Sequence, residues 1–504
     1  MDIEQQQKAN SNRKRKRKQK HKEVEPDDAS SAVGINKLPD DVLVDFLSRL
    51  ISRNEAVRTS VLSHRWRYLW KFCSSGTLEL DDKGIFSILG SDDRDDLAKR
   101  ITTLRRKFID RVNRVLKLHQ GLSLDGLIIR FGHVRSRRAG RPPGYIDDWI
   151  YFAMQKKVKI FELDFSISDW LLHACYDFPN VDKLLSHDAE FGFGYLRSLR
   201  FVGVDIEDKV VHYFLAKCPY LEQLSIRDSE TTRSIRVVDP LVNLKVLEIC
   251  DCNLIKSIDV SSINLVSCTY EGRNIDLLIK ETPNLSDLTL GGAFPCSFIH
   301  EPNKHSSYSV QLVKLTLSTP DSFFFVDCSD VRGRTGPRDF PLLCSLKHLE
   351  LNVWSPIDRS TNMITSLIMG APLLNELKIK ICHLKYPWNL GYDNIEVSPE
   401  QEQYCHENLK AVKMTEYVGH PSDDMFVLQL LKIAPSLETV TIDTESEYYD
   451  NEPWVKCIRA KCKGGKKKEC ICTSQGIGAR TRIEAKQRAE LLKFRFPPNT
   501  VLIV

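Results

Sequence analysis

The feature that most constrains the fold is a short apolar motif, L-x-x-L-x-L, which recurs along much of the chain. Ten copies follow one another, and their first positions lie 20 to 35 residues apart. The copies are Leu196/Leu199/Phe201, Leu221/Leu224/Ile226, Leu244/Leu247/Ile249, Leu265/Cys268/Tyr270, Leu285/Leu288/Leu290, Leu312/Leu315/Leu317, Leu346/Leu349/Leu351, Leu374/Leu377/Ile379, Leu409/Val412/Met414 and Leu437/Val440/Ile442. A single copy occurs by chance in many buried strands, but ten in series predict one repeated structural unit.

The unit is identified as a leucine-rich repeat. The copy that starts at Leu244 continues through Cys252 and Leu254, which completes the template L-x-x-L-x-L-x-x-C-x-L. Four copies also follow an apolar run that ends in proline, at Pro219, Pro283, Pro372 and Pro435. Proline cannot continue a helix and favours an extended chain before it, so helix, proline and strand form one repeat. We expect an α/β fold, an irregular solenoid with a parallel sheet on the concave side and helices on the convex side.

Two earlier segments extend this array towards the amino terminus. Leu124/Leu127/Ile129 and Val158/Phe161/Leu163 predict early strands, with a helix around Trp149 between them. The solenoid is therefore expected over residues 75–408. A segment rich in Gly, Pro and Arg between about 318 and 345 lengthens one repeat and is interpreted as a solvated loop, with a binding loop as the alternative.

Residues beside the second and third apolar positions of each copy should point out of the sheet, because side chains alternate along a strand. Their charges are mixed and name no class of ligand. The candidate target-binding residues are Arg200, Arg227, Glu248, His348, Glu350 and Lys378. The same outward set contains Gln223, Asp287, Glu376, Lys380 and Lys413. The alternative interpretation is that these side chains only keep the sheet soluble.

Residues 34–74 have the pattern of short amphipathic helices. Pro39 suits the first turn of a helix, Asp40 and Asp41 complement its positive end, and Ser52 and Glu55 fit a capping box for a second helix. The apolar stripe of the first helix consists of Leu43, Phe46, Leu47 and Leu50, and that of a third helix of Trp66, Leu69 and Trp70. About 40 residues cannot build a self-sufficient core, so either the rest of the chain or a partner must cover this surface.

These residues also carry a resemblance to a known family. Leu38-Pro39-Asp40-Asp41-Val42-Leu43, followed by Ala56-Val57-Arg58-Thr59-Ser60-Val61-Leu62-Ser63-His64-Arg65-Trp66-Arg67-Tyr68-Leu69-Trp70, resembles the F-box of a large plant family that combines F-box, leucine-rich repeats and an FBD-type region. Residues 409–443, Ala489-Glu490-Leu491-Leu492 and Pro497-Pro498-Asn499 resemble its FBD region, so 409–504 is interpreted as FBD-like repeats and a cap, with an exposed loop at 444–480.

The resemblance implies a function without catalysis by the chain itself. It implies the substrate-recognition subunit of an SCF-type ubiquitin ligase, in which the F-box binds a Skp-like adaptor and, through it, a cullin. The repeats would then bind a target protein whose identity the sequence does not give. The adaptor-binding residues that the resemblance implies are Leu38, Pro39, Leu43, Leu47, Val57, Leu62 and Trp66.

The amino-terminal 33 residues differ in composition from the rest. They are polar and are expected to be disordered. The run Arg13-Lys14-Arg15-Lys16-Arg17-Lys18 predicts a nuclear-import signal, which places the chain in the nucleus and also in the cytoplasm. Residues 13–22 carry eight Lys/Arg within a net charge of +5, so the body has a net charge of −3 and nucleic acid is not the expected partner. The alternative function is a nuclear repeat-based binding protein with a non-functional F-box, whose tail contacts nucleic acid.

Other functional classes lack their signatures. The chain contains no Gly-x-Ser-x-Gly, His-Glu-x-x-His or phosphate-loop motif, so neither an enzyme nor a cofactor is expected. No apolar run approaches the roughly 18 residues that span a membrane. Cys457, Cys462, Cys470 and Cys472 lack the paired C-x-x-C spacing of a zinc site, so we expect free thiols and no metal.

Overall fold

The structure is a computed structural model that describes residues 37–49, 64–82, 94–132, 144–166, 176–185, 192–238, 243–318, 341–354, 361–382, 405–417, 419, 421–444 and 477–504. It divides into two compact units. The first comprises residues up to Gly76 together with Leu118–Leu122, and the second comprises Thr77–Lys117 and Ser123–Val504. The predictions for the basic tail, the second F-box helix, the insert at 319–340 and most of the loop at 444–480 lie outside the described residues.

The first unit is small and helical. It contains α2 (Asp40–Ser48), α4 (Trp66–Leu69) and the 3-10 turn η3 (Trp70–Phe72). The segment Leu118–Leu122 belongs to it because the amides of Gln120 and Gly121 both donate to the carbonyl of Lys71, at 2.7 and 3.1 Å. These two bonds hold the segment Leu118–Leu122 against the end of the F-box region within the first unit.

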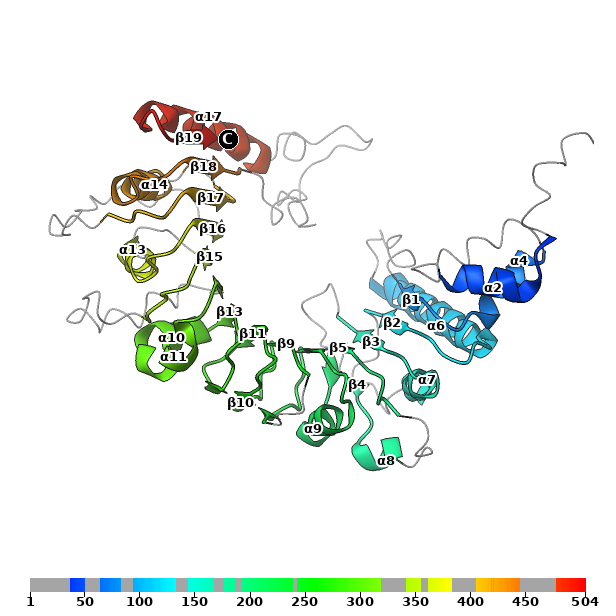
Figure 1. Cartoon of the computed structure of the whole chain (residues 1–504). Coiled ribbons are helices and arrows are strands. Elements are labelled where there is room, and N and C mark those ends of the chain that lie inside the picture. Colours follow the sequence, from blue (N-terminus) through cyan, green and yellow to red (C-terminus); the bar gives the residue numbers. More distant parts are fainter. Residues whose placement is uncertain are drawn as a thin grey trace, which may run out of the picture. The chain divides into compact units, whose positions relative to one another are not determined.

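The second unit is built around one long parallel sheet (Figure 1). Among the described residues its strands, in spatial order, are β1 (Thr77–Asp81), β2 (Gly126–Arg130), β3 (Ile160–Asp164), β5 (Ser198–Val202), β7 (Gln223–Arg227), β9 (Val246–Cys250), β11 (Ser267–Gly272), β13 (Asp287–Gly292), β14 (Lys314–Ser318), β15 (His348–Trp354), β16 (Glu376–Cys382), β17 (Ala411–Thr415), β18 (Thr439–Ile442) and β19 (Val501–Ile503). All ten predicted motifs form strands of this sheet, and the two earlier segments form β2 and β3. The predicted α/β repeat solenoid is confirmed.

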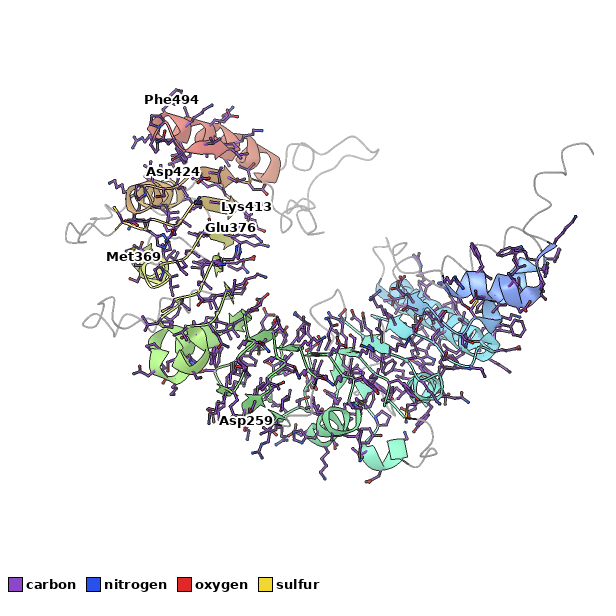
Figure 2. The ribbon with its side chains drawn as sticks, viewed as in Figure 1. Asp259, Met369, Glu376, Lys413, Asp424 and Phe494 are labelled. Carbon is purple, nitrogen blue, oxygen red and sulfur yellow. The ribbon has the colours of Figure 1, made fainter. Side chains whose placement is uncertain are left out.

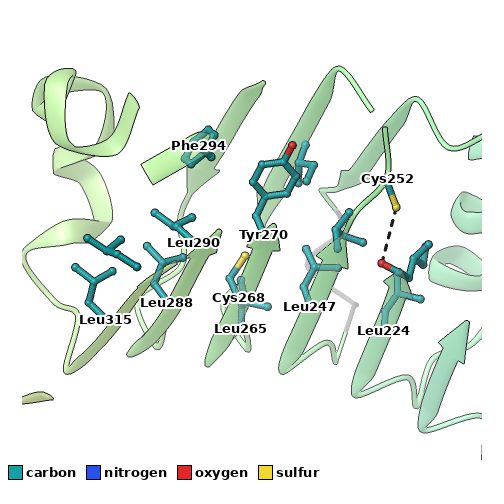
Figure 3. Packing of buried hydrophobic residues seen from close by; sticks show 14 of the residues in the cluster. Leu224, Leu247, Cys252, Leu265, Cys268, Tyr270, Leu288, Leu290, Phe294 and Leu315 are labelled. Atoms are coloured by element: carbon teal, nitrogen blue, oxygen red, sulfur yellow. Dashed lines mark hydrogen bonds between the residues drawn. The ribbon is translucent and has the colours of Figure 1, made fainter. Parts of the chain in front are cut away.

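Apolar side chains form two continuous rows on the side of the sheet that faces the core. In the first row, Leu224, Leu247, Cys268, Leu288 and Leu315 lie side by side on consecutive strands (Figure 3). They are all at most 2% exposed. Because each strand supplies only two such side chains, no repeat can bury them alone, and burial depends on the strand on either side.

The four proline motifs form turns rather than only ending helices. In each one the amide of the first leucine donates to the carbonyl three residues earlier, as Leu221 does to Cys218 at 3.0 Å and Leu285 to Thr282 at 3.1 Å. Proline occupies the second position of the turn, where its fixed φ angle is favourable. The turn places the leucine under the sheet at the point where the strand begins.

An asparagine just before the first leucine links several repeats, a signal that the motif search missed. The side-chain amides of Asn243, Asn284 and Asn408 each donate to a carbonyl of the preceding repeat, at 2.7 to 2.9 Å. The acceptors are the carbonyls of Pro219, Ile263 and Pro372, which lie in the turns before the strands of the preceding repeats. These contacts fix the spacing of neighbouring repeats at the turn.

Helices lie on the convex side of the main sheet, the side that carries the two apolar rows, and the strands line the concave side (Figure 1). The helices are α6 (Arg94–Leu118), α7 (Gly144–Gln155), α8 (Val181–Leu185), α9 (Asp208–Lys217), α10 (Phe294–His300), α11 (Pro302–Ser309), α13 (Thr361–Met369), α14 (Pro421–Ile433) and α17 (Ile477–Leu492). Where the repeats are shortest, strands replace helices: β8 (Ser234–Val237), β10 (Ser257–Ser261) and β12 (Asp276–Lys280) form a second parallel sheet. A two-stranded pair, β4 (Tyr176–Asp177) and β6 (Val204–Asp205), precedes it.

The carboxy-terminal segment packs against the last repeats. Ala485 and Ala489 of α17 are buried in the common core, and Arg488 pairs with Asp424 of α14 at 2.6 Å. After the 3-10 turn η9 (Lys493–Arg495), the hydroxyl of Thr500 donates to the carbonyl of Leu437, and β19 pairs with β18. The last described strand is thus fastened to the repeat before it by α17 and by this bond.

One glycine at the end of β13 provides a test of the repeat packing. Gly292 has a φ of +71°, and a Cβ atom there would lie 2.2 Å from the carbonyl oxygen of Gly272 on the neighbouring strand. We expect Gly292→Ala to lower the free energy of unfolding by about 1–3 kcal/mol, because the left-handed conformation and the close backbone both oppose a side chain.

The matched control is Gly144→Ala at the start of α7, where a Cβ would meet no atom within 4 Å. Urea denaturation followed by circular dichroism measures both variants. Equal stability of the two would show that the strands do not approach as closely as described.

Candidate functional site

The first candidate surface lies on the helical unit. On α2, Leu43 and Leu47 are buried, whereas Val42 and Phe46 are 44% and 50% exposed. On α4 and η3, Trp66 and Trp70 are buried. Each helix therefore has an apolar side that is already covered and a second apolar side that is not.

The structure gives the exposure of five of the seven predicted adaptor-binding residues. Leu43, Leu47 and Trp66 are at most 1% exposed, so their side chains are not available to a partner in this conformation. The short helices use their strongest apolar stripe for internal packing, which periodicity alone cannot distinguish from an interface. Leu38 and Pro39 are exposed as the prediction requires, and Val57 and Leu62 lie outside the described residues.

Four exposed apolar side chains of this unit are absent from the predicted adaptor-binding set. Val42 and Phe46 make one pair on α2, and Tyr68 and Phe72 make another at 52% and 47% exposed. Val42 and Phe46 share one face of α2, because residues four apart lie on the same side of an α-helix. Tyr68 lies in α4 and Phe72 in the 3-10 turn η3, so no single helical stripe contains both of them. The exposed apolar set is Leu38, Val42, Phe46, Tyr68 and Phe72, and we call it the F-box surface.

Arg65 fixes the segment that leads into α2. Its guanidinium contacts the carboxylate of Asp40 and also donates to the carbonyl of Leu38, both at 2.5 Å. These bonds join residues 25 and 27 positions apart, and so connect the start of the first helix with the start of α4. The pair is partly exposed, so its main effect is on the orientation of Leu38 and Pro39 rather than on stability.

The second candidate surface is the outward face of the long sheet, which consists of the first, third and fifth residues of each strand in register. All six predicted target-binding residues lie there, and so do Gln223, Asp287, Glu376, Lys380 and Lys413. Of the six, Arg200 pairs with Glu248 at 3.5 Å and Lys378 with Glu350 at 2.8 Å.

Two arginines of this face bridge across an intervening strand. Arg200 on β5 reaches Glu248 on β9, and Ser225 on β7 lies between them and donates to Glu248 at 2.8 Å. Arg227 on β7 likewise reaches Glu271 on β11 at 3.6 Å. The residue between that pair on β9 is Cys250. A small side chain on the middle strand leaves room for each guanidinium.

Arg227 is the more strongly held of the two. It also lies 3.5 Å from Asp251, and its pKa is raised above the ordinary value because the negative groups around it outweigh its desolvation. His348, the remaining predicted residue, contacts Glu376 at 3.0 Å. The outward face is therefore a lattice of paired charges, which gives it a fixed pattern without a bound partner.

The thiols close to this lattice are not nucleophiles. Burial raises the pKa of Cys250 and Cys268 to about 12, and that of Cys252 to about 11. A thiolate, not a thiol, is the reactive form, so these groups are inert near neutral pH. Among the described residues no three His, Cys, Asp or Glu side chains are grouped so that they could hold a metal ion.

Comparison with known proteins identifies the family. The family model described as "At1g61320/AtMIF1, LRR domain" matches residues 185–489, which is more than half of the chain. This protein belongs to that leucine-rich-repeat family. The match spans all ten predicted motifs and continues through most of α17.

Relatives from Arabidopsis thaliana extend the similarity beyond the repeats. The chain is 26% identical over 430 residues to F-box/FBD/LRR-repeat protein At1g13570, across 81% of this chain and 91% of that protein. It is 26% identical to FBD-associated F-box protein At5g38590, across 81% and 93%. FBD-associated F-box protein At5g56370 is 28% identical, across 51% and 54%.

These similarities confirm the recognition of a plant F-box, leucine-rich-repeat and FBD protein. They support a repeat-containing F-box protein with a general role in protein interaction, and they indicate no enzyme family. Among the described residues, no helix is both long enough and apolar enough to cross a lipid bilayer.

Alkylation of thiols tests the burial of the repeat core. We expect iodoacetamide at pH 8 to modify the exposed Cys344 and Cys405 at least about 100-fold faster than Cys250 or Cys268, because the buried thiols remain protonated. Mass spectrometry of tryptic peptides at successive times gives the rate at each site. Rapid labelling of Cys268 in the native protein would contradict the described core.

Proposed function

We propose that this protein recruits targets to an SCF-type ubiquitin ligase. A Skp-like adaptor binds the F-box surface, a cullin joins through the adaptor, and the outward face of the repeats binds the target. The observation that carries the proposal is the F-box surface itself, where five apolar side chains on and beside α2, α4 and η3 remain 39% or more exposed.

An exposed apolar set on so small a unit favours a protein partner. Fully burying a side chain such as Phe46 contributes about 1.5–3 kcal/mol, so a few of them can supply much of the affinity of an interface. Asp40 and Asp41 lie beside this set in the first turn of α2, and Asp45 and Arg49 pair at the other end of the helix. Charged groups around an apolar centre are typical of interfaces.

The chain is proposed to act by bringing the target protein close to the ubiquitin-conjugating enzyme. The chain contributes no reacting group to ubiquitin transfer. It holds the target close to the conjugating enzyme, which raises the effective concentration of the target lysine.

Retention of the adaptor tests the proposal. We expect full-length protein to retain a Skp-type adaptor and cullin in a pull-down at physiological salt, and Val42→Glu/Phe46→Glu to lose them. Two carboxylates on the F-box surface would be desolvated without partners, which costs several kcal/mol. Thermal unfolding followed by circular dichroism checks that the variant is folded.

The control is Phe494→Glu, which introduces the same kind of charge at a phenylalanine that is 88% exposed and lies in η9 (Figure 2). It should retain the adaptor as the unaltered protein does. If the unaltered protein retains neither adaptor nor cullin, the proposal is wrong, and the chain is a repeat-based binding protein only.

We further propose that the protein acts in the nucleus as well as in the cytoplasm. The support is the basic run Arg13–Lys18. Replacing these six residues by alanine in a fluorescent fusion should move the protein from nucleus to cytoplasm, as measured by imaging in plant cells. An unchanged distribution would show that this run is not an import signal.

A further inference from the structure

The charge of the outward face changes sign along the sheet. From β1 to β13 its rows carry seven carboxylates and three guanidinium groups, namely Glu79, Asp81, Glu162, Asp164, Glu248, Glu271, Asp287, Arg130, Arg200 and Arg227. From β14 to β18 they carry four lysines, two carboxylates and one histidine, namely Lys314, Lys378, Lys380, Lys413, Glu350, Glu376 and His348. The two parts of the face therefore suit different ligands.

Lys413 is exceptional among the cations of this face. The other six each have a carboxylate within 4 Å, and the pairs are Arg130–Glu162, Arg200–Glu248, Arg227–Glu271, Lys314–Asp287, Lys378–Glu350 and Lys380–Glu416. Within the described part of the chain, the exposed ammonium of Lys413 has neither an ion pair nor a hydrogen bond. It is the cation left for an external anion.

The register places this free cation beside two others. Lys413 on β17 is level with Lys378 on β16, and Lys380 lies two residues further along β16. Adjacent strands are about 4.8 Å apart, and like charges directly opposite one another are destabilising. The hydroxyl of Thr441, level with Lys413 on β18, adds a donor on the other side.

The side chain of Lys413 projects from the strand side of the repeats. Figure 2 shows Lys413 and Glu376 on this side, and Met369 at the end of α13 on the opposite side. The two neighbouring lysines are each paired with a carboxylate, Lys378 with Glu350 on β15 and Lys380 with Glu416 just after the end of β17. Glu376, two residues before Lys378 on β16, pairs with His348, so among the described residues Lys413 is the lysine of this group that no carboxylate pairs with.

We propose that Lys378, Lys380 and Lys413, which we call the lysine face, bind an acidic segment of the target protein, a run of aspartate or glutamate side chains. The proposal rests on the proposed function and specifies the chemistry of its target. Every permanent cation in these rows from β14 to β18 is lysine, a compact point charge, whereas the planar fork of arginine suits bidentate phosphate contacts. The excess of carboxylates from β1 to β13 would repel a nucleic-acid backbone that continued along the face.

A charged peptide tests the proposal before any target is known. The probe is a fluorescein-labelled peptide of ten glutamates, titrated with full-length protein and followed by fluorescence anisotropy at two salt concentrations. We expect Lys413→Glu to weaken binding at least about fivefold, because an unpaired cation is replaced by an anion beside Lys378. A ten-glutamine peptide should not bind.

Lys256→Glu is the matched control. It makes the same change in net charge at another exposed lysine, which precedes β10 of the second sheet, and Figure 2 shows Asp259 of that strand on the side away from the outward face. Binding by the basic tail is common to all variants, so the difference between the two substitutions isolates the lysine face. Equal weakening by both, or no weakening by Lys413→Glu, would overturn the proposal.

The adaptor pull-down on the same proteins separates this inference from the proposed function. Lys413→Glu should retain the adaptor fully. If the unaltered protein fails to retain the adaptor but the two lysine variants still differ for the peptide, the ligase function fails and the lysine face stands. If the adaptor is retained and the variants do not differ, only the lysine face fails.

Discussion

The structure depends on one constraint, the inability of a single repeat to bury its own two rows of apolar side chains. Each strand contributes a pair such as Leu288 and Leu290, and these are covered only because strands and helices of neighbouring repeats lie against them. Removing one such leucine would cost about 2–5 kcal/mol, so the inner rows cannot vary freely. Alternation along the strand then fixes which residues face outwards, and the binding face follows from the core.

The outward face is ordered by electrostatic pairing rather than by packing. Arg200 and Arg227 each reach a carboxylate two strands away, which requires the small Ser225 or Cys250 on the strand between. Exposed pairs of this kind add little to stability, about 0–1 kcal/mol each. Their contribution is to hold long side chains in one arrangement, so that fewer rotamers are lost when a partner binds.

The spacing of leucines was sufficient to predict the ten repeat strands, because a strand in a repeat array is defined by the same residues that bury it. It did not predict β1 or β19, which have the sheet's alternation but not the full motif, nor the second sheet of β8, β10 and β12. In the F-box unit, periodicity identified Leu43, Leu47 and Trp66 as apolar. Whether such a stripe faces the unit's own core or a partner depends on the neighbouring helices, and sequence periodicity does not contain that information.

The buried rows and the outward rows of the sheet place different demands on the sequence. This difference explains how relatives whose sequences are about a quarter identical to this chain can share the repeat architecture. The inner rows need only remain apolar and of similar volume, a requirement that many sequences meet. Outward positions contribute so little to stability that they can change charge without unfolding the chain. A lysine such as Lys413, which no carboxylate pairs with among the described residues, gains nothing from the folded state itself. Selection for stability therefore does not fix the residue at this position, which leaves it free to vary with what the face binds.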